Sequence, residues 1–276
     1  MAGLRELRKR LKSIRTTGQL AGAMRTVAAA KYSRVNAARL SYETYAAACR
    51  EMQRAAGRMG AAPAAVAERS RCWVLFSGNR GLCGGFNAEL LNLFYSRYRE
   101  TAPAPLVIAC GKMAAAFCKE KGIQLEREMP FQDVPRFDEA QQLAEYVAGL
   151  YASGAVSGVD VLYQRFENML RQTPLIRQIL PAADDAAPAE AEDVLFLPDR
   201  ETVCERLAEH GFDTMVYAIA LEHASGAQAA TLMAMRSAYD NAAQSALELE
   251  TTINRRRQAE VTASVIETAS DNVQQQ

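Results

Sequence analysis

A glycine-rich run, Gly78-Asn79-Arg80-Gly81-Leu82-Cys83-Gly84-Gly85, is the part of the sequence whose residue types and spacing come closest to a chemical motif. It follows an apolar segment that predicts a strand and precedes a segment that predicts a helix, which is the setting of phosphate-binding loops. The run lacks the G-x-G-x-x-G spacing of dinucleotide sites and the Gly-Lys-Ser/Thr of a P-loop, and Gly111-Lys112-Met113 fails the same test. The sequence therefore favours a structural turn, in which Gly81, Gly84 and Gly85 let backbone segments approach closely, over a nucleotide site.

Side chains suited to acid-base, nucleophilic or metal chemistry are few. The chain has two histidines, His210 and His223, and six cysteines without a C-x-x-C pair: Cys49, Cys72, Cys83, Cys110, Cys118 and Cys204. We therefore predict no catalytic residue, no metal ligand and no cofactor, and interpret the cysteines as small buried residues. His210 precedes Gly211, a pair typical of the last turn of a helix that ends at glycine.

Both ends of the chain lack proline, because all nine prolines fall between Pro63 and Pro198. Since proline breaks helices, both ends are free to be helical. The N-terminal end carries an apolar stripe through Leu4, Leu7, Leu11, Ile14, Ala21, Met24 and Val27. The C-terminal end has the spacing of a left-handed coiled coil, alternately three and four residues, at Leu232, Met235, Tyr239, Ala242, Ala246, Leu249 and Ile253.

The two ends also differ in charge. Ten of the first 40 residues are Arg or Lys and one is acidic, whereas residues 199–276 hold six basic and twelve acidic residues. A long amphipathic helix cannot bury its stripe alone, so we predict that the ends pack on each other as an antiparallel coiled coil. Gly18, Gly22 and Gly226 mark weak points or close contacts, since glycine in a helix costs about 1 kcal/mol relative to alanine.

Between the ends, short apolar runs alternate with helical patterns. The predicted strands are Cys72–Ser77, Leu106–Cys110, Ile123–Arg127, Val159–Phe166 and Leu175–Leu180. Helices are predicted near Asn87–Arg99, Lys112–Lys121, Phe137–Tyr151 and Glu201–His210. The alternation predicts a Rossmann-like α/β domain with a mostly parallel sheet. The chain is thus divided into an N-terminal coiled-coil helix (1–62), an α/β globular domain (70–211) and a C-terminal coiled-coil helix (212–276) that pairs with the first.

Composition narrows the class of protein further. No run of 18 apolar residues exists, so no direct membrane span is predicted, and the basic N-terminus lacks the apolar core of a secretory signal. That basic segment could contact phosphates, but residues 1–31 contain no aromatic side chain to stack on bases. A solvated helix face, or contact with an acidic protein, is favoured over nucleic acid.

Taken together, these residues resemble the gamma subunit of F-type ATP synthases along nearly the whole chain. The resemblance rests on residues 11–15 and 21–32, on Arg80-Gly81-Leu82-Cys83-Gly84-Gly85-Phe86-Asn87, and on residues 233–235, 240–242 and 253–262. It implies a central-stalk rotor, not itself an enzyme, within a proton-translocating ATP synthase that serves ATP synthesis and hydrogen ion transport. It further implies that rotation of a membrane ring changes the nucleotide affinity of each catalytic subunit in turn.

The same resemblance supplies partners and contact residues. The implied partners are the alpha and beta subunits, the epsilon subunit and the membrane rotor ring of c subunits, with the chain peripheral at the cytoplasmic face of a bacterial cell membrane. Arg257, Gln258 and Thr262 match family positions that contact beta subunits, and Met24 matches a position near that zone.

Three departures from the family pattern are visible. Ala227 and Thr231 stand where the family usually has Glu and Arg, and Phe196-Leu197 where Tyr-Glu is common. Two other hypotheses stay open at this point. One is a nucleotide-binding α/β protein with a coiled-coil dimerisation arm, and the other is a basic coiled coil that binds nucleic acid.

Overall fold

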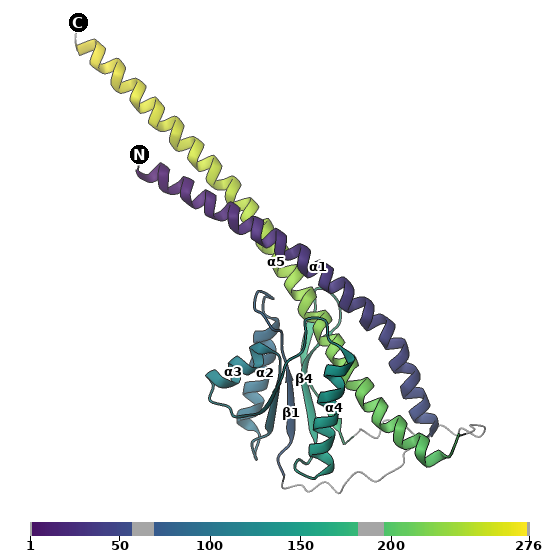
Figure 1. The fold of residues 1–276 in the computed structure, drawn as a ribbon. Helices are drawn as coiled ribbons and strands as arrows, with labels where there is room; N and C mark the ends of the chain where they lie inside the picture. Colours follow the sequence, from purple (N-terminus) through teal and green to yellow (C-terminus); the bar gives the residue numbers. More distant parts are fainter. Residues whose placement is uncertain (1, 57–68, 182–195, 275–276) are drawn as a thin grey trace. The chain divides into compact units, whose positions relative to one another are not determined.

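The computed structural model describes residues 2–56, 69–181 and 196–274. Two long helices, α1 (Ala2–Ala56) and α5 (Arg200–Gln274), begin and end the described chain (Figure 1). The chain divides into two compact units, Met1–Val27 with Leu232–Gln276, and Ala28–Thr231. Each long helix therefore contributes residues to both units.

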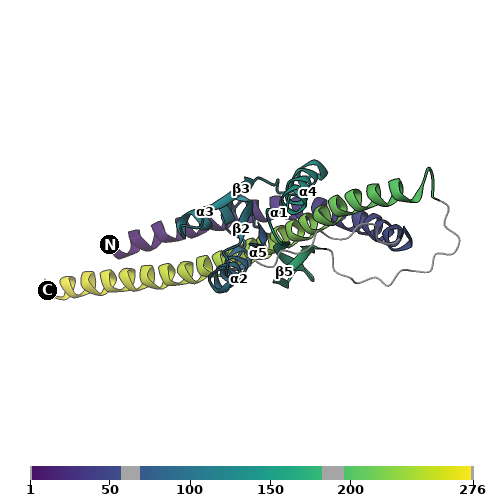
Figure 2. The same ribbon diagram turned by 90° about the horizontal axis from the view of Figure 1, so that it is seen from below.

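The first unit is an antiparallel pair formed by the start of α1 and the end of α5. As the residue number rises along α1 from Gly3 to Gly22, that of the nearest residue on α5 falls from Arg256 to Tyr239. Figures 1 and 2 show the beginning of α1 and the last turns of α5 at the same end of this pair. The antiparallel coiled coil predicted from the apolar spacing is confirmed.

The second unit contains a five-stranded sheet in the order β3-β2-β1-β4-β5. Its strands are β1 (Cys72–Phe76), β2 (Leu106–Cys110), β3 (Leu125–Met129), β4 (Val159–Phe166) and β5 (Gln172–Leu180). All pairings are parallel except that of β4 with β5, so the prediction of a mostly parallel sheet is confirmed. The connecting helices are α2 (Phe86–Glu100), α3 (Lys112–Glu120) and α4 (Phe137–Ala152).

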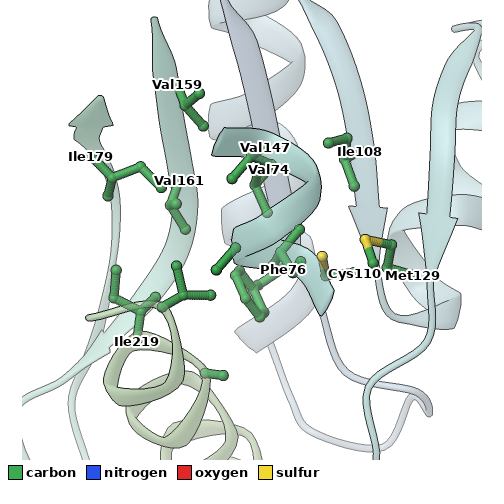
Figure 3. Close-up of a cluster of buried hydrophobic side chains, with 14 of the residues drawn as sticks. Val74, Phe76, Ile108, Cys110, Met129, Val147, Val159, Val161, Ile179 and Ile219 are labelled. Atoms are coloured by element: carbon green, nitrogen blue, oxygen red, sulfur yellow. The ribbon is translucent and has the colours of Figure 1, made fainter. Parts of the chain in front are cut away.

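Helices cover both faces of this sheet because alternate side chains of each strand point to opposite sides. On one face, Val74 and Phe76 pack with side chains from α4 and from residues 216–220 of α5 (Figure 3). On the other face, Trp73 and Leu75 pack with α2 and α3. A stretch of α5 is therefore part of the core of the α/β domain.

Apart from the helix predicted at Glu201–His210, the predicted elements agree with the structure to within a few residues, and one shift has a clear cause. The strand predicted from Ile123 begins at Leu125. Gly122 has a φ of +68°, and the N–H of Ile123 donates to the carbonyl of Cys118. Ile123 therefore belongs to the turn that closes α3, and its apolar side chain is buried without being part of a strand.

One prediction about the helices was wrong. Gly211 was interpreted as a helix end after His210, but α5 is continuous from Arg200 to Gln274, and Gly211 does not have a positive φ. An interior glycine costs a helix only about 1 kcal/mol, which packing of its neighbours can offset. Gln53 lies against Gly211, so a larger side chain there would displace it.

Val27 was also misplaced on the apolar stripe, since its side chain is 54% exposed. Successive steps of three residues rotate a stripe around the helix, whereas a step of seven keeps nearly the same face. Ala28, seven residues after the buried Ala21, is accordingly buried.

Candidate functional site

The start of α3 is the first place at which a phosphate could bind, because unpaired amides at a helix N-terminus attract anions. In this structure those amides already have partners. The N–H groups of the first three residues of α3 donate to Asn79 Oδ1 (3.3 Å), Gly78 O (3.2 Å) and Ser77 Oγ (2.8 Å), respectively. The glycine-rich turn thus caps the helix and leaves these three donors no capacity for a ligand.

The turn itself is held by internal contacts. Asn87 accepts the N–H of Gly78 at 2.9 Å and donates to the carbonyl of Arg80 at 3.2 Å. Gly84 has a φ of +59°, and Gly85 is the residue that precedes α2. A Cβ on Gly81 would meet open space, so its surroundings do not require glycine. A purely structural role for these glycines stays a prediction.

A doubly wound sheet can also bind a ligand in a crevice at the carboxyl ends of its strands. The crevice forms between two neighbouring strands whose connections leave in opposite directions, which are β1 and β4 here. The side chain of His223, from α5, fills this position. The imidazole is 5.7 Å from the ring of Phe76 and 5.1 Å from that of Phe86, measured between centroids. Its Nδ1 accepts the N–H of Gln164 at 3.2 Å.

Close packing of α5 in this crevice also depends on Gly226. A Cβ on Gly226 would lie 3.0 Å from Phe86 and 3.2 Å from Gln172. Gln164, fully buried, donates from its side chain to the carbonyl of Phe86 at 2.7 Å. The helix α5 therefore occupies the crevice in which other doubly wound folds bind nucleotides, which argues against the nucleotide-binding alternative.

Burial lowers the pKa of His223 to about 3, because the charged imidazolium loses its hydration there. The unfolded chain takes up a proton near the ordinary pKa of 6.5, so it binds more protons than the folded chain between pH 6.5 and 3, and stability falls as the pH falls through that window. From pH 7.5 to 5.0, this one group should lower the free energy of unfolding by about 2 kcal/mol.

Urea denaturation at both pH values measures this loss. In the variant His223→Asn, which keeps an acceptor but does not titrate, we expect the same pH change to cost about 2 kcal/mol less. His210→Gln, at the only other histidine, should leave the loss in place. An equal pH dependence in His223→Asn and the unaltered chain would show that His223 is not buried in its neutral form.

The four predicted partner-contact residues do not form a single cluster. Arg257, Gln258 and Thr262 are exposed near the end of α5, and the Thr262 hydroxyl donates to the carbonyl of Gln258 at 2.9 Å. Met24 is half-buried on α1 and lies close in register to Tyr239 of α5. Tyr239 and Arg257 are 18 residues apart on α5. At 1.5 Å per residue, the two sites are roughly 27 Å apart along the pair.

Beyond Arg256, α5 continues past the beginning of α1. The apolar side chains of Val261 and Val265 are 58% and 62% exposed there. Closer to the middle of the pair, Arg25 lies over the ring of Tyr239, 4.8 Å from its centroid. The end of α5 therefore combines basic, polar and apolar groups on one exposed helix.

The sequence pattern missed a polar network in the α/β unit. Lys31 of α1 donates to Asp133 at 2.5 Å, and Asn79 of the glycine-rich turn donates to the same carboxylate at 3.3 Å. Lys31, Asn79 and Asp133 lie far apart in the chain, and nothing in the sequence pattern connects them. Only the three-dimensional structure brings them together.

Comparison with known proteins identifies the chain. A family model described as ATP synthase matches residues 3–270. The gamma chain of the ATP synthase of Moorella thermoacetica is 30% identical over 276 residues, which cover 97% of each chain. This chain belongs to the ATP synthase gamma-chain family. The gamma chain of Rubrobacter xylanophilus is likewise 30% identical and covers 98% of this chain and 97% of its own.

Solved structures agree on the fold of this gamma chain. A chain of the Euglena gracilis mitochondrial ATP synthase matches it with a TM-score of 0.70 and 20% identity, covering 98% of this chain and 93% of its own. A central-stalk chain of the Tetrahymena thermophila enzyme matches with a TM-score of 0.62 and 18% identity, covering 79% and 99%. The predictions of the family, the fold class and a non-catalytic subunit of an ATP synthase are confirmed.

The structure also bears on the predictions about the cysteines and about membrane spans. All six cysteines are buried free thiols, as the sequence predicted. Within the described residues, no helix is both long and apolar enough to cross a membrane.

Proposed function

We propose that this gamma chain couples rotation of a membrane ring of c subunits to changes of nucleotide affinity in a hexamer of alpha and beta subunits. The observation that carries the proposal is the antiparallel pair of α1 and α5, whose two helices expose different side chains. A ligand or partner that binds two states equally shifts no equilibrium between them. An unsymmetrical shaft meets each beta subunit with a different surface, and so it can favour a different nucleotide state in each.

Charge contributes to this asymmetry. The first turns of α1 present exposed basic side chains at Arg5, Arg8, Lys9, Arg10, Lys12 and Arg15. On the partner helix, Glu250 accepts a hydrogen bond from Arg15, which shows how a carboxylate can be received on this face. We infer that the basic face meets acidic loops of the beta subunits as the shaft turns.

The contact residues of the hexamer are inferred to be Arg257, Gln258 and Thr262, with Met24 at a second level. The three residues on α5 are exposed, so their polar groups are available to a partner. Arg257 can donate two parallel hydrogen bonds to a carboxylate, which lysine cannot do. The helical residues Val261 and Val265 beside them offer apolar surface for the same partner.

The α/β domain has its own proposed partners. We propose that residues 70–211 contact the epsilon subunit and the ring of c subunits. Residues 1–62 and 212–276 would supply the shaft, with residues 216–220 of α5 packed in the core of the α/β domain as well. As a gamma chain, the protein is a peripheral subunit of a membrane-associated enzyme. The bacterial relatives favour the cytoplasmic face of a bacterial membrane as its location.

Reconstitution tests this function. Co-expressed with alpha and beta subunits of a bacterial relative, the chain should co-purify with them and form a complex that hydrolyses ATP. In that complex, Arg257→Ala should lower the hydrolysis rate by about tenfold, the size expected for one lost hydrogen bond between charged groups. Calorimetry on the isolated chain should detect binding of neither ATP nor NAD.

Arg255 provides the matched control, since it is also exposed and lies about 200° around the helix from Arg257. Arg255→Ala should change the hydrolysis rate by less than about twofold. A chain that does not co-purify with alpha and beta subunits, or that binds a nucleotide by itself, would contradict the proposed function.

A further inference from the structure

The helix α1 is attached to the α/β unit by an apolar cluster. Val35 of α1 packs with Leu221 and Ala224 of α5, and partly buried side chains of both helices and of Val134 surround them. Apolar burial is non-directional: it opposes separation of two surfaces but selects no single partner atom. A hydrogen bond between charged groups adds a direction that apolar contacts do not supply.

A directional contact lies beside this cluster. Lys31 Nζ donates to Asp133 Oδ2 at 2.5 Å, and the two side chains are 29% and 24% exposed. Hydrogen bonds between charged groups are stronger than neutral ones and depend on geometry, and partial burial protects this pair from screening by salt. The pair therefore resists displacement of α1 along or around its own axis.

Asp133 is itself held in place by the glycine-rich turn. Asn79 donates from its side-chain nitrogen to Asp133 Oδ1 at 3.3 Å and to the carbonyl of Phe131 at 2.7 Å. Partial burial alone would raise the pKa of Asp133, but the hydrogen bonds from Lys31 and Asn79 outweigh it and keep the pKa below its ordinary value. Asp133 is therefore ionised at neutral pH and oriented towards α1.

The place of this contact along α1 determines the load that it carries. Ala28 is the first residue of α1 in the α/β unit, and Lys31 follows three residues later. When a helix is twisted against the domain that holds it, the contacts nearest the free part of the helix bear the largest share of the force. On α5 the corresponding attachment is deep, since His223, Ser225 and Ala229 are all buried. Lys31 and Asp133 form the hydrogen bond from α1 to the rest of the α/β unit that lies nearest to Ala28, among the hydrogen bonds of the described residues.

We propose that Lys31 and Asp133, with Asn79 as the orienting residue, form a torque-bearing pair that makes α1 turn together with the α/β domain. All three are positioning residues, because they act on coupling and touch no nucleotide. The inference rests on the proposed rotor function and assigns a role to the glycine-rich turn, which orients a carboxylate where related architectures hold a phosphate.

The test uses the complete ATP synthase assembled with this chain as its gamma subunit, in inverted membrane vesicles. Two quantities are measured, the rate of ATP hydrolysis and the ATP-driven proton pumping at matched hydrolysis. In Lys31→Met and in Asp133→Asn, hydrolysis should stay within about twofold, while pumping per ATP falls by about fivefold. The exchanged pair, Lys31→Asp with Asp133→Lys, should recover part of the pumping, because it restores the ion pair but removes the carboxylate that accepts from Asn79. A merely structural defect would not be relieved by the exchange.

Arg165→Gln is the control, because it removes one ion pair between neighbouring residues, Arg165 and Glu167, and leaves Glu167 with Arg171. It should leave pumping per ATP unchanged. Where a single variant assembles poorly, Lys31→Arg, which keeps the charge, should assemble and pump as the unaltered chain does.

The outcomes separate the two proposals. Normal assembly with unchanged pumping in both single variants, or an exchanged pair that pumps no better than they do, overturns the torque-bearing pair alone. Failure of the unaltered chain to assemble with the hexamer overturns the proposed function, and with it this inference.

Discussion

Replacement of Gly111 by alanine is expected to destabilise the α/β domain by about 4 kcal/mol or more, which is exceptional for a single substitution. Gly111 has a φ of +113° and a ψ of 152°, a region of backbone conformation that is essentially restricted to glycine. A Cβ there would also lie 2.2 Å from the carbonyl oxygen of Ser77, which belongs to the backbone and cannot rotate away. The variant therefore suffers strain and a steric clash together.

The effect of Gly111→Ala is measured as the free energy of unfolding in urea, with the yield of soluble chain as a second readout. Gly149→Ala is the matched control, because Gly149 lies inside α4 and a Cβ there would meet nothing within 4 Å. Alanine favours helices, so this control should gain about 0.5–1 kcal/mol. A soluble Gly111→Ala chain within about 1 kcal/mol of the unaltered one would contradict the expectation.

Gly111 also shows why the glycine-containing turns were easy to find in the sequence but hard to assign a role. The absence of a Cβ at Gly111 leaves room for Ser77 beside the start of α3, where the serine hydroxyl accepts the N–H of Ala114. The sequence marks both glycine-containing turns as special but does not say what occupies the space beside them. That information lies in contacts between residues remote in the chain, such as Asn79 with Asp133.

Patterns that depend on neighbouring residues were predicted well. The absence of proline and the three-and-four spacing of apolar residues are local, and they predicted both long helices and their pairing. Strand β2 and the start of α4 were placed at the correct residue, because apolar runs and helix starts are also local signals. The continuity of α5 past Gly211 was not predicted, since Gly211 weakens a helix by an amount that packing elsewhere overcomes.

The candidate site was predicted only in part. Exposure of Arg257, Gln258 and Thr262 follows from their place outside the apolar seam, and the family resemblance marked them as contacts. Nothing in the sequence around His223 indicated that it would fill the crevice between β1 and β4. The burial of His223 involves a strand that is distant in the sequence, because its Nδ1 accepts the N–H of Gln164 in β4.

The second large effect is expected at Asp160, which holds β1 and β4 together at the ends where these strands begin. Asp160 is 7% exposed and accepts hydrogen bonds from Arg71 Nε at 2.5 Å and Arg71 Nη2 at 2.6 Å. Trp73 Nε1, also buried, donates to the same carboxylate at 3.1 Å. The side chain was interpreted from sequence only as part of a strand, yet it satisfies two partners at once.

Asp160→Ala leaves the guanidinium of Arg71 and the indole N–H of Trp73 without this acceptor, and we expect a loss of about 3 kcal/mol in the free energy of unfolding. The double variant with Arg71→Ala should lose less than the sum of the two single variants, because removal of both charges leaves neither one unpaired. Arg97→Gln breaks a pair with Glu100 whose side chains are 60% and 67% exposed, and it should change stability by less than about 1 kcal/mol. Additive losses in the double variant would mean that Asp160 stabilises the sheet by packing alone, whereas non-additive losses would show that the charged hydrogen bonds join β1 to β4.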